Sequence, residues 1–226
     1  MIQRYINTSL YSVDNFFQQD RWFYRLKINN YQIVSILWNL GLMFVPWLSV
    51  KLLAIWWHKT HFHKIGHKLV ALALFLIWLL FIPNTAYVIS EVRHLIDYCP
   101  RDSEFQVCEK NAWMSIFFFT YSLIGWIFFV YLTTQMRNLI ELIWSKMIGY
   151  LFVLILMPVM ALGFLLGLLN RWNSWEFFIY PKQFFQTLPV YWQDEVYFTN
   201  WLIFTIFLYI LYFGGQWLFK DRIKYL

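Results

Sequence analysis

The feature that most constrains this chain is the recurrence of long apolar stretches with almost no charge. A helix that crosses a bilayer needs about 20 consecutive, mostly apolar residues. Five stretches of the sequence meet this requirement, and across all 226 residues 61% are apolar while only 13% are charged. A soluble domain of this length could not bury so much apolar surface. The sequence therefore excludes a disordered chain, a disulfide-rich secreted module and an ordinary soluble enzyme.

We expect an all-α fold, a polytopic transmembrane helical bundle of about five spans. Prolines inside the spans are tolerated, because neighbouring helices can satisfy the carbonyl groups that a proline leaves free. A further apolar stretch, 175–197, is interrupted by Pro181 and Pro189, so we expect an interfacial or re-entrant segment rather than a sixth span. The expected spans are 31–57, 68–95, 113–134, 147–170 and 198–219.

The first 30 residues differ from the remainder of the chain. Residues 1–30 are polar and aromatic and contain no apolar stretch of the kind found in a signal peptide. We expect an interfacial segment, and a helix lying on the membrane surface is an open alternative for it. Residues 31–226 show no internal repeat and are predicted to form a single transmembrane domain in the cell membrane.

Five spans place the two ends of the chain on opposite faces, here called side A (the N-terminal end) and side B. Each side carries nine Lys and Arg residues, but side A has ten acidic residues and side B has two. The basic residues of side B are concentrated in 59–68 and 220–224, which favours a cytoplasmic location for that side. We therefore expect the N-terminus outside and the C-terminus in the cytoplasm. The basic residues form no single patch, so the net charge of +6 does not indicate a nucleic-acid partner.

Two cysteines, Cys99 and Cys108, lie in one side A loop. On an extracytoplasmic face they could form a short disulfide, and two free thiols are the alternative. The spacing alone does not decide between these states, because a disulfide requires a specific geometry.

The second span carries a polar stripe. At helical spacing its four members fall within an arc of about 80° on one face, with Val88 and Val92 on the opposite, apolar face. Ionisable groups in a membrane are costly and are functional candidates by default. The stripe therefore predicts the lining of a polar cavity that reaches the side A surface. Its members are Asn84, Tyr87, Glu91 and His94.

Two further readings of ionisable residues concern metal ions. Glu91 and His94 form a Glu-x-x-His pair, which supplies metal ligands in some four-helix proteins, but those sites use two such pairs. Four histidines with loose spacing lie in the loop between the first two spans, and contact with anionic lipid headgroups explains a basic loop better than a metal does. We expect no metal ion and no cofactor. The four histidines are His58, His61, His63 and His67.

A second polar cluster follows the fourth span on side A. Arg171 comes directly after a long apolar run and needs a partner or water, and Glu91 on the same side is the best candidate. We therefore predict that Arg171 and Glu91 lie close together. The tryptophans of the cluster are also typical of an interfacial aromatic belt. The cluster is Arg171, Trp172, Asn173, Ser174, Trp175 and Glu176.

Motifs of common chemistries are absent from the sequence, which has no Gly-rich phosphate loop, no nucleophile elbow and no zinc-protease motif. Gly163 and Gly167 form Gly-x-x-x-Gly, which indicates a closely packed helix face. Gly214 and Gly215 could serve the same purpose in the fifth span.

The two side A clusters together resemble the hallmarks of a bacterial membrane-protein family catalogued as domain of unknown function 1361. The resemblance rests on Pro83-Asn84-x-x-Tyr87 followed by Glu91 and His94, and on Arg171-Trp172-Asn173-Ser174-Trp175. It covers roughly residues 31–215 and implies a membrane protein, but it supplies no reaction. Two positions depart from the family pattern: no acid follows Trp113, and Leu168 stands where an arginine is common.

These observations predict an extracytoplasmic polar site that binds a small polar ligand, a lipid headgroup or a partner membrane protein. Proton-coupled transport through Glu91 and His94 is one alternative, and a membrane-embedded enzyme that uses this pair as acid and base is another. A purely structural role in locking the helices together is a further reading. The predicted site residues are Asn84, Tyr87, Glu91, His94, Arg171, Trp172, Asn173, Trp175 and Glu176.

Overall fold

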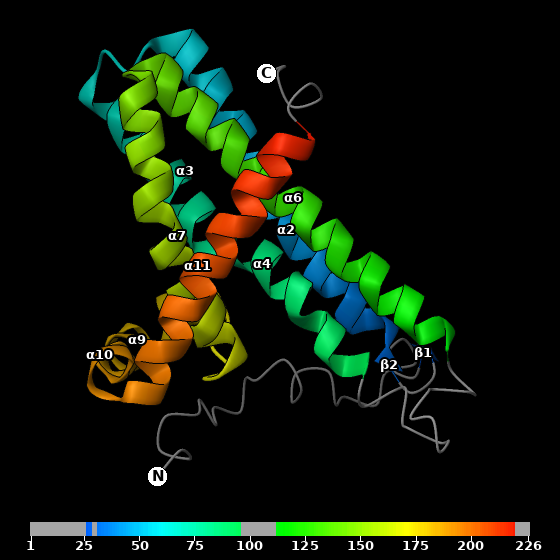
Figure 1. Ribbon diagram of the computed structural model, residues 1–226. Coiled ribbons are helices and arrows are strands. Elements are labelled where there is room, and N and C mark those ends of the chain that lie inside the picture. Colours follow the sequence, from blue (N-terminus) through cyan, green and yellow to red (C-terminus); the bar gives the residue numbers. More distant parts are fainter. Residues whose placement is uncertain (1–25, 29–30, 96–111, 220–226) are drawn as a thin grey trace.

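The computed structural model describes residues 26–28, 31–95 and 112–219, and five of its helical segments are long and apolar enough to cross a membrane (Figure 1). The predicted all-α transmembrane bundle is therefore confirmed. Cys99 and Cys108 lie outside the described residues. Four of the spans are continuous helices: α2 (Ile33–Thr60), α6 (Trp113–Ile143), α7 (Lys146–Leu168) and α11 (Glu195–Leu218).

The second span is divided rather than continuous. It consists of α3 (Ile65–Phe81), α4 (Pro83–Ile89) and the 3-10 helix η3 (Ser90–His94). The division follows from Pro83, which has no N–H to donate to the preceding turn. Side chains close the turn at this division: the Asn84 amide donates to the Phe81 carbonyl at 3.0 Å, and the Thr85 hydroxyl donates to the Ile82 carbonyl at 2.7 Å.

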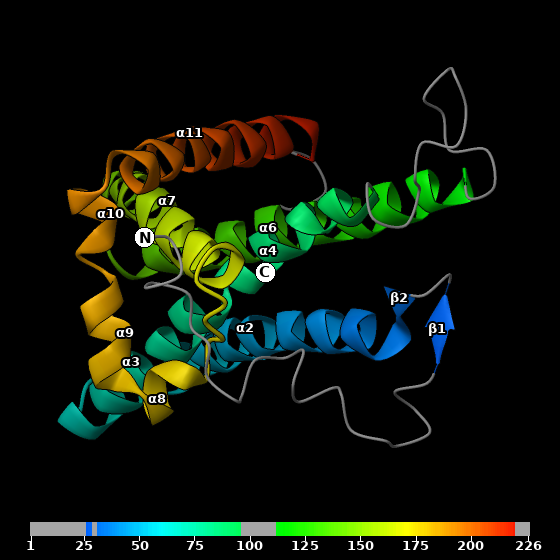
Figure 2. The ribbon, with the colours of Figure 1, turned by 90° about the horizontal axis from the view of Figure 1, so that it is seen from below.

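The helices pack so that α4 and α6 lie between α2 and α11 (Figure 2). Close approach depends on glycines without a side chain. A Cβ atom on Gly125 of α6 would come within 2.9 Å of Val88, and one on Gly163 of α7 would come within 2.8 Å of Pro83. Val88, on the apolar side of the predicted stripe, is thus fully buried between helices. The close-packed face expected for the Gly-x-x-x-Gly motif is the face of α7 that meets α4.

Proline inside α7 is accommodated by a neighbouring helix, as the sequence predicts. Pro158 frees the carbonyl of Leu154, and the Tyr209 hydroxyl of α11 donates a hydrogen bond to it at 2.5 Å. The Trp201 indole N–H of α11 donates to the Pro158 carbonyl at 2.9 Å. Two hydrogen bonds therefore join α11 to α7 around the proline.

The largest difference from the expected spans is at the end of the third, which continues past Thr134 to Ile143. Buried apolar residues at helical spacing, among them Met136, Leu139 and Ile140, keep this extension packed against the bundle. The prediction from hydropathy ends this span early because Arg137 and Glu141 interrupt the apolar stretch. The whole helix is about 46 Å long, which exceeds the hydrocarbon thickness of a bilayer.

The stretch that the sequence marks as interfacial or re-entrant contains three short helices, α8 (Glu176–Ile179), α9 (Pro181–Thr187) and α10 (Val190–Gln193). None is long enough to span a bilayer. These helices lie at the end of the bundle where the short antiparallel strands β1 (Lys27–Ile28) and β2 (Tyr31–Gln32) pair (Figure 1, lower part). This end is side A, and the α2–α3 loop and the α6–α7 turn lie at the opposite end, side B.

Candidate functional site

The centre of the side A site is the carboxylate of Glu91, which is only 2% exposed. The Tyr31 hydroxyl donates a hydrogen bond to Glu91 Oε2, and His94 Nε2 lies 3.6 Å from the same oxygen. Strand β2 supplies the tyrosine, whereas η3 supplies both the acid and the histidine. Two segments far apart in the sequence therefore enclose one carboxylate.

Tyr31 keeps its hydroxyl proton in this arrangement and so remains a hydrogen-bond donor. Burial raises the pKa of its hydroxyl, and the negative charge of Glu91 raises the pKa further. The phenol therefore stays protonated at all physiological pH values. Its ring is held edge-on by Phe118, with the ring centroids 5.2 Å apart, and lies 5.6 Å from the His94 ring. Aromatic packing thus fixes the hydroxyl on the carboxylate.

A second group of donors surrounds Tyr87. Arg93 Nη2 donates to the Tyr87 hydroxyl at 3.2 Å, and the guanidinium carbon lies 5.7 Å from the ring centroid. Glu91 and Arg171 both act electrostatically on this hydroxyl. Among the described residues, neither Arg93 Nε nor the indole Nε1 of Trp172 has a hydrogen-bond partner, although both atoms are buried. The site therefore has donor capacity that the described chain does not use.

The segment after α7 is tied to three other parts of the bundle. The Asn84 amide donates to the Ser174 hydroxyl at 3.1 Å, and Trp175 meets Trp38 of α2 edge to face at 5.7 Å. Asn170 accepts a hydrogen bond from the Tyr191 hydroxyl of α10 at 2.7 Å. The segment therefore holds α2, α4 and α10 together at side A.

Glu176 organises this segment internally. Its side chain is fully buried, and its Oε2 accepts hydrogen bonds from the backbone N–H of Asn173 at 2.7 Å and from the Asn173 side-chain amide at 3.2 Å. A carboxylate that accepts backbone N–H groups at the start of a short helix stabilises that turn. Glu176 and Asn173 therefore shape the segment.

Arg171 differs from its expected arrangement. No ion pair joins it to Glu91 within the described chain, because Glu91 is held by Tyr31 and His94 instead. Arg171 is exposed, and its φ of 60° places it in the left-handed region, which is uncommon outside glycine and asparagine. Such backbone is often found at functional sites.

The polar stripe of the second span therefore divides between two sets of neighbours. Asn84 contacts the 170–176 segment, and Tyr87 lies against α7 beside Gly167. Glu91 and His94 instead meet β2 and α6. The change from α-helix to 3-10 helix at Ser90 alters the period of the stripe, which accounts for the division.

Sequence reasoning missed three residues of this site: Tyr31, Arg93 and Ser174. Tyr31 stands at the expected start of the first span, where an aromatic residue is unremarkable. Arg93 is a neighbour of Glu91 in sequence, so the expected helix pointed it away from the stripe. Ser174 lies within the second motif, and its match with Asn84 depends on a long-range contact that no local pattern encodes.

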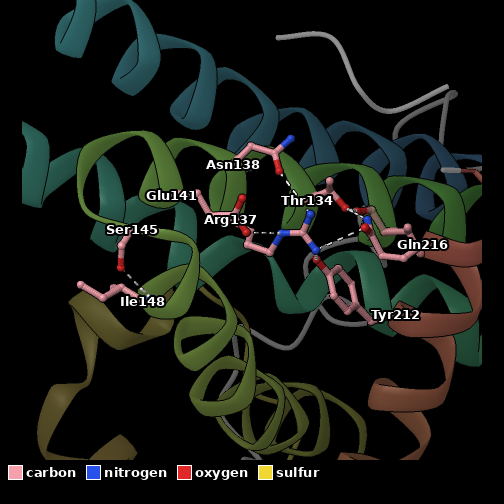
Figure 3. Close-up of polar contacts among 9 residues, drawn as sticks. Thr134, Arg137, Asn138, Glu141, Ser145, Ile148, Tyr212 and Gln216 are labelled. Atoms are coloured by element: carbon pink, nitrogen blue, oxygen red, sulfur yellow. Dashed lines mark hydrogen bonds and ion pairs between the residues drawn. The ribbon is translucent and has the colours of Figure 1, made fainter. Parts of the chain in front are cut away.

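A separate polar cluster occupies the side B end of α6, also missed from sequence (Figure 3). Arg137 Nε lies 3.2 Å from Glu141 Oε1, and its Nη1 donates to the Tyr212 hydroxyl at 3.1 Å and to Gln216 Oε1 at 3.3 Å. The Gln216 amide in turn donates to the Thr134 hydroxyl. The cluster joins α6 to α11 and gives the arginine both a counter-charge and neutral acceptors.

The histidine loop contains no metal centre in the structure. Within residues 26–28, 31–95 and 112–219, no group of three or more His, Cys, Asp or Glu side chains could hold a metal ion. His61 and His63 lie side by side with ring centroids 6.0 Å apart, and His58 and His63 are exposed.

Five apolar spans with polar clusters at both ends define a multi-pass helical membrane protein. The chain belongs to the family described as protein of unknown function (DUF1361), whose sequence model matches residues 38–212. The resemblance drawn from the two hallmarks is thus confirmed, and both hallmarks lie inside the match. No curated protein and no solved structure matches the chain in the same comparisons.

Proposed function

We propose that this protein binds a small polar ligand at side A, in a site formed by α4, η3 and residues 170–176, on the extracytoplasmic face of the membrane. The observation that carries the proposal is the pair of buried donors, Arg93 Nε and Trp172 Nε1, that have no partner among the described residues. A buried donor without a partner costs about 1–3 kcal/mol. A ligand with acceptor groups would recover that cost.

The charges around the site indicate what such a ligand carries. The Arg93 guanidinium donates to the Tyr87 hydroxyl, and Arg171 directly precedes Trp172, whose indole N–H has no partner among the described residues. Guanidinium groups favour carboxylate and phosphate oxygens, which they bind in a directional manner. The carboxylate of Glu91 stands two residues before Arg93 in η3 and can accept a hydrogen bond from a ligand hydroxyl or ammonium. The ligand is therefore a small molecule with an anionic or strongly accepting end.

The remaining predicted residues take supporting roles in this proposal. His94 lies 3.6 Å from the Glu91 carboxylate and orients it, and Asn84 holds the 170–176 segment against α4. Asn173 and Glu176 shape the turn that presents Arg171. Trp172 and Trp175 wall the site on the side of α2 and α9.

Native mass spectrometry of the full chain in mild detergent tests the proposal. Wild type is compared with Glu91→Gln, Arg93→Gln and the side B control Glu141→Gln. We expect wild type and the control to retain a bound species of defined mass that both side A variants lose. A small solute mass supports the proposal, whereas a phospholipid mass or a second protein assigns the site to a headgroup or a partner. Bare protein in all four samples, or the same adduct in all four, overturns it.

Proton-coupled transport is the second candidate, and the divided second span favours it. Broken helices near ionisable groups form the substrate sites of many transporters. Here the division at Pro83 precedes a carboxylate that lies 3.6 Å from an imidazole. Uptake of protons by reconstituted vesicles, measured with wild type and Glu91→Gln in the presence of the mass-identified solute, distinguishes transport from binding alone.

A further inference from the structure

A large apolar cavity lies at the side B end of the bundle, far from the site described above. Its volume is about 790 Å³, and it is lined by residues of α2, α3, α6 and α7. The apolar wall includes Leu53 of α2, Phe75 of α3, Ile140 of α6 and Phe152 of α7. A cavity of this size lies in the range that accommodates a substantial organic ligand.

One rim of this cavity is basic. His61, His63 and Lys68 line it, and all three are exposed. They come from the α2–α3 loop and the first turn of α3, in which no acidic residue occurs between 58 and 68. A cavity with a lysine ammonium and imidazole N–H donors at its rim and an apolar interior is complementary to a molecule with an anionic head and an apolar tail.

The cavity also opens toward the face that bilayer lipids contact. Leu72 and Ile148 line the cavity and are nevertheless 52% and 37% exposed, which places apolar side chains at its mouth. Trp144, another lining residue, is 63% exposed at the junction of α6 and α7. Exposed tryptophan is typical of the level where headgroups begin. A lipid could therefore enter from the adjoining leaflet without crossing water.

We propose that this cavity holds one acyl chain of an anionic phospholipid from the side B leaflet, with the headgroup at His61, His63 and Lys68. The charge of the rim selects an anionic headgroup over a zwitterionic one. The lipid would fill the space among four helices and so join the α2–α3 hairpin to the α6–α7 hairpin. This site is independent of the proposed side A ligand, since it shares no residue with it.

Photolabelling tests the proposal. The probe is phosphatidylglycerol with a diazirine in the middle of one acyl chain, added to delipidated full-length protein in mild detergent. We expect label on peptides that contain Ala71, Phe75 and Ile140, with competition by unlabelled phosphatidylglycerol. The matching phosphatidylcholine probe should label these peptides about fivefold less, which corresponds to roughly one cationic contact with an anionic headgroup.

Matched variants separate the cavity from the surface around it. Ala71→Trp narrows the cavity and should remove most of the label, whereas Val70→Trp adds the same side chain at an exposed position outside the lining. Lys68→Gln should reduce labelling about fivefold, and Lys64→Gln, which is exposed and outside the lining, should leave it unchanged. Lys68→Gln keeps the test decisive if Ala71→Trp fails to fold.

Three results would overturn the proposal. Label spread evenly over all five spans would mean that no acyl chain is held in the cavity. Equal labelling by the two lipids would remove the role of the basic rim. Unchanged labelling in both Ala71→Trp and Lys68→Gln would place the bound lipid elsewhere on the protein.

Discussion

Each end of the bundle holds a charged side chain, fully buried at side A and partly buried at side B, and the two charges are compensated in different ways. At side B, Arg137 has a carboxylate 3.2 Å away and neutral acceptors from α11. At side A, Glu91 has a phenol and an imidazole, while the neighbouring Arg93 donates only to the Tyr87 hydroxyl and forms no ion pair with an acid of the described chain. A charge compensated within its own cluster is typical of a structural tie. A guanidinium without a counter-charge in the described chain is typical of a binding site for an anionic group.

The largest effect expected from this comparison is the loss of the side B arginine. Arg137→Met leaves Glu141 mostly buried without its counter-charge and should lower the free energy of unfolding by about 3 kcal/mol. Denaturant titration of the purified protein in detergent measures it. The double variant Arg137→Met, Glu141→Leu should recover most of the loss, because no unpaired charge remains. If the single variant is as stable as wild type, the side B cluster is not a structural tie.

Loss of the Tyr31 hydroxyl should lower stability less than loss of Arg137, and the size of the loss should depend on Glu91. Tyr31→Phe removes a hydrogen bond to a buried carboxylate and should cost about 2 kcal/mol of stability. In a Glu91→Gln background the same change should cost only about 1 kcal/mol, since the acceptor is then neutral. Denaturant titration of wild type, the two single variants and the double variant gives the coupling free energy between Tyr31 and Glu91. An equal cost in both backgrounds would show that the Tyr31 hydroxyl does not depend on the Glu91 carboxylate as its acceptor.

The sequence predicts the parts of this comparison that depend on local patterns, and it does not predict contacts between residues far apart in the chain. Apolar length predicts the five spans, and local spacing predicts that Asn84, Tyr87, Glu91 and His94 are exceptional. The hydroxyl partner of Glu91, Tyr31, comes from 60 residues away and depends on a two-stranded ribbon that no hydropathy pattern marks. Arg137 was assigned to a loop, because its place in a helix depends on packing of Met136 and Ile140 against the bundle.

Alkaline pH tests the enclosure of Tyr31 at side A. The pKa of Tyr31 is raised in the folded state by burial and by Glu91, whereas in the unfolded chain a tyrosine titrates near about 10. Its contribution to stability is therefore complete below that pH and is lost as the pH rises toward the folded pKa. Between pH 10 and 11 wild type should lose about 1 kcal/mol more than Tyr31→Phe.

A control for this pH effect is Tyr191 of α10, whose pKa is also raised by burial, with a further contribution from Tyr197. Tyr191→Phe should remove a similar share of the alkaline loss, and the two changes should add, because they affect different segments. A pH dependence that is identical in wild type and in Tyr31→Phe would mean that the phenol is accessible to solvent, contrary to the enclosed carboxylate described here.

The smallest effects on stability are expected for two partly exposed contacts, one at each end of the bundle. Ser174→Ala removes the acceptor of the Asn84 amide, which is only partly buried, and should lower stability by about 0.5–1 kcal/mol. Asn138→Ala at side B removes a 3.4 Å contact with Arg137 and should be nearly neutral. The two variants therefore differ little in unfolding. They should differ in native mass spectra, because release of the 170–176 segment from α4 displaces Arg171 and Trp172, and with them the bound species. Retention of that species in Ser174→Ala would mean that the segment is positioned by its other ties and that the Asn84 contact serves packing alone.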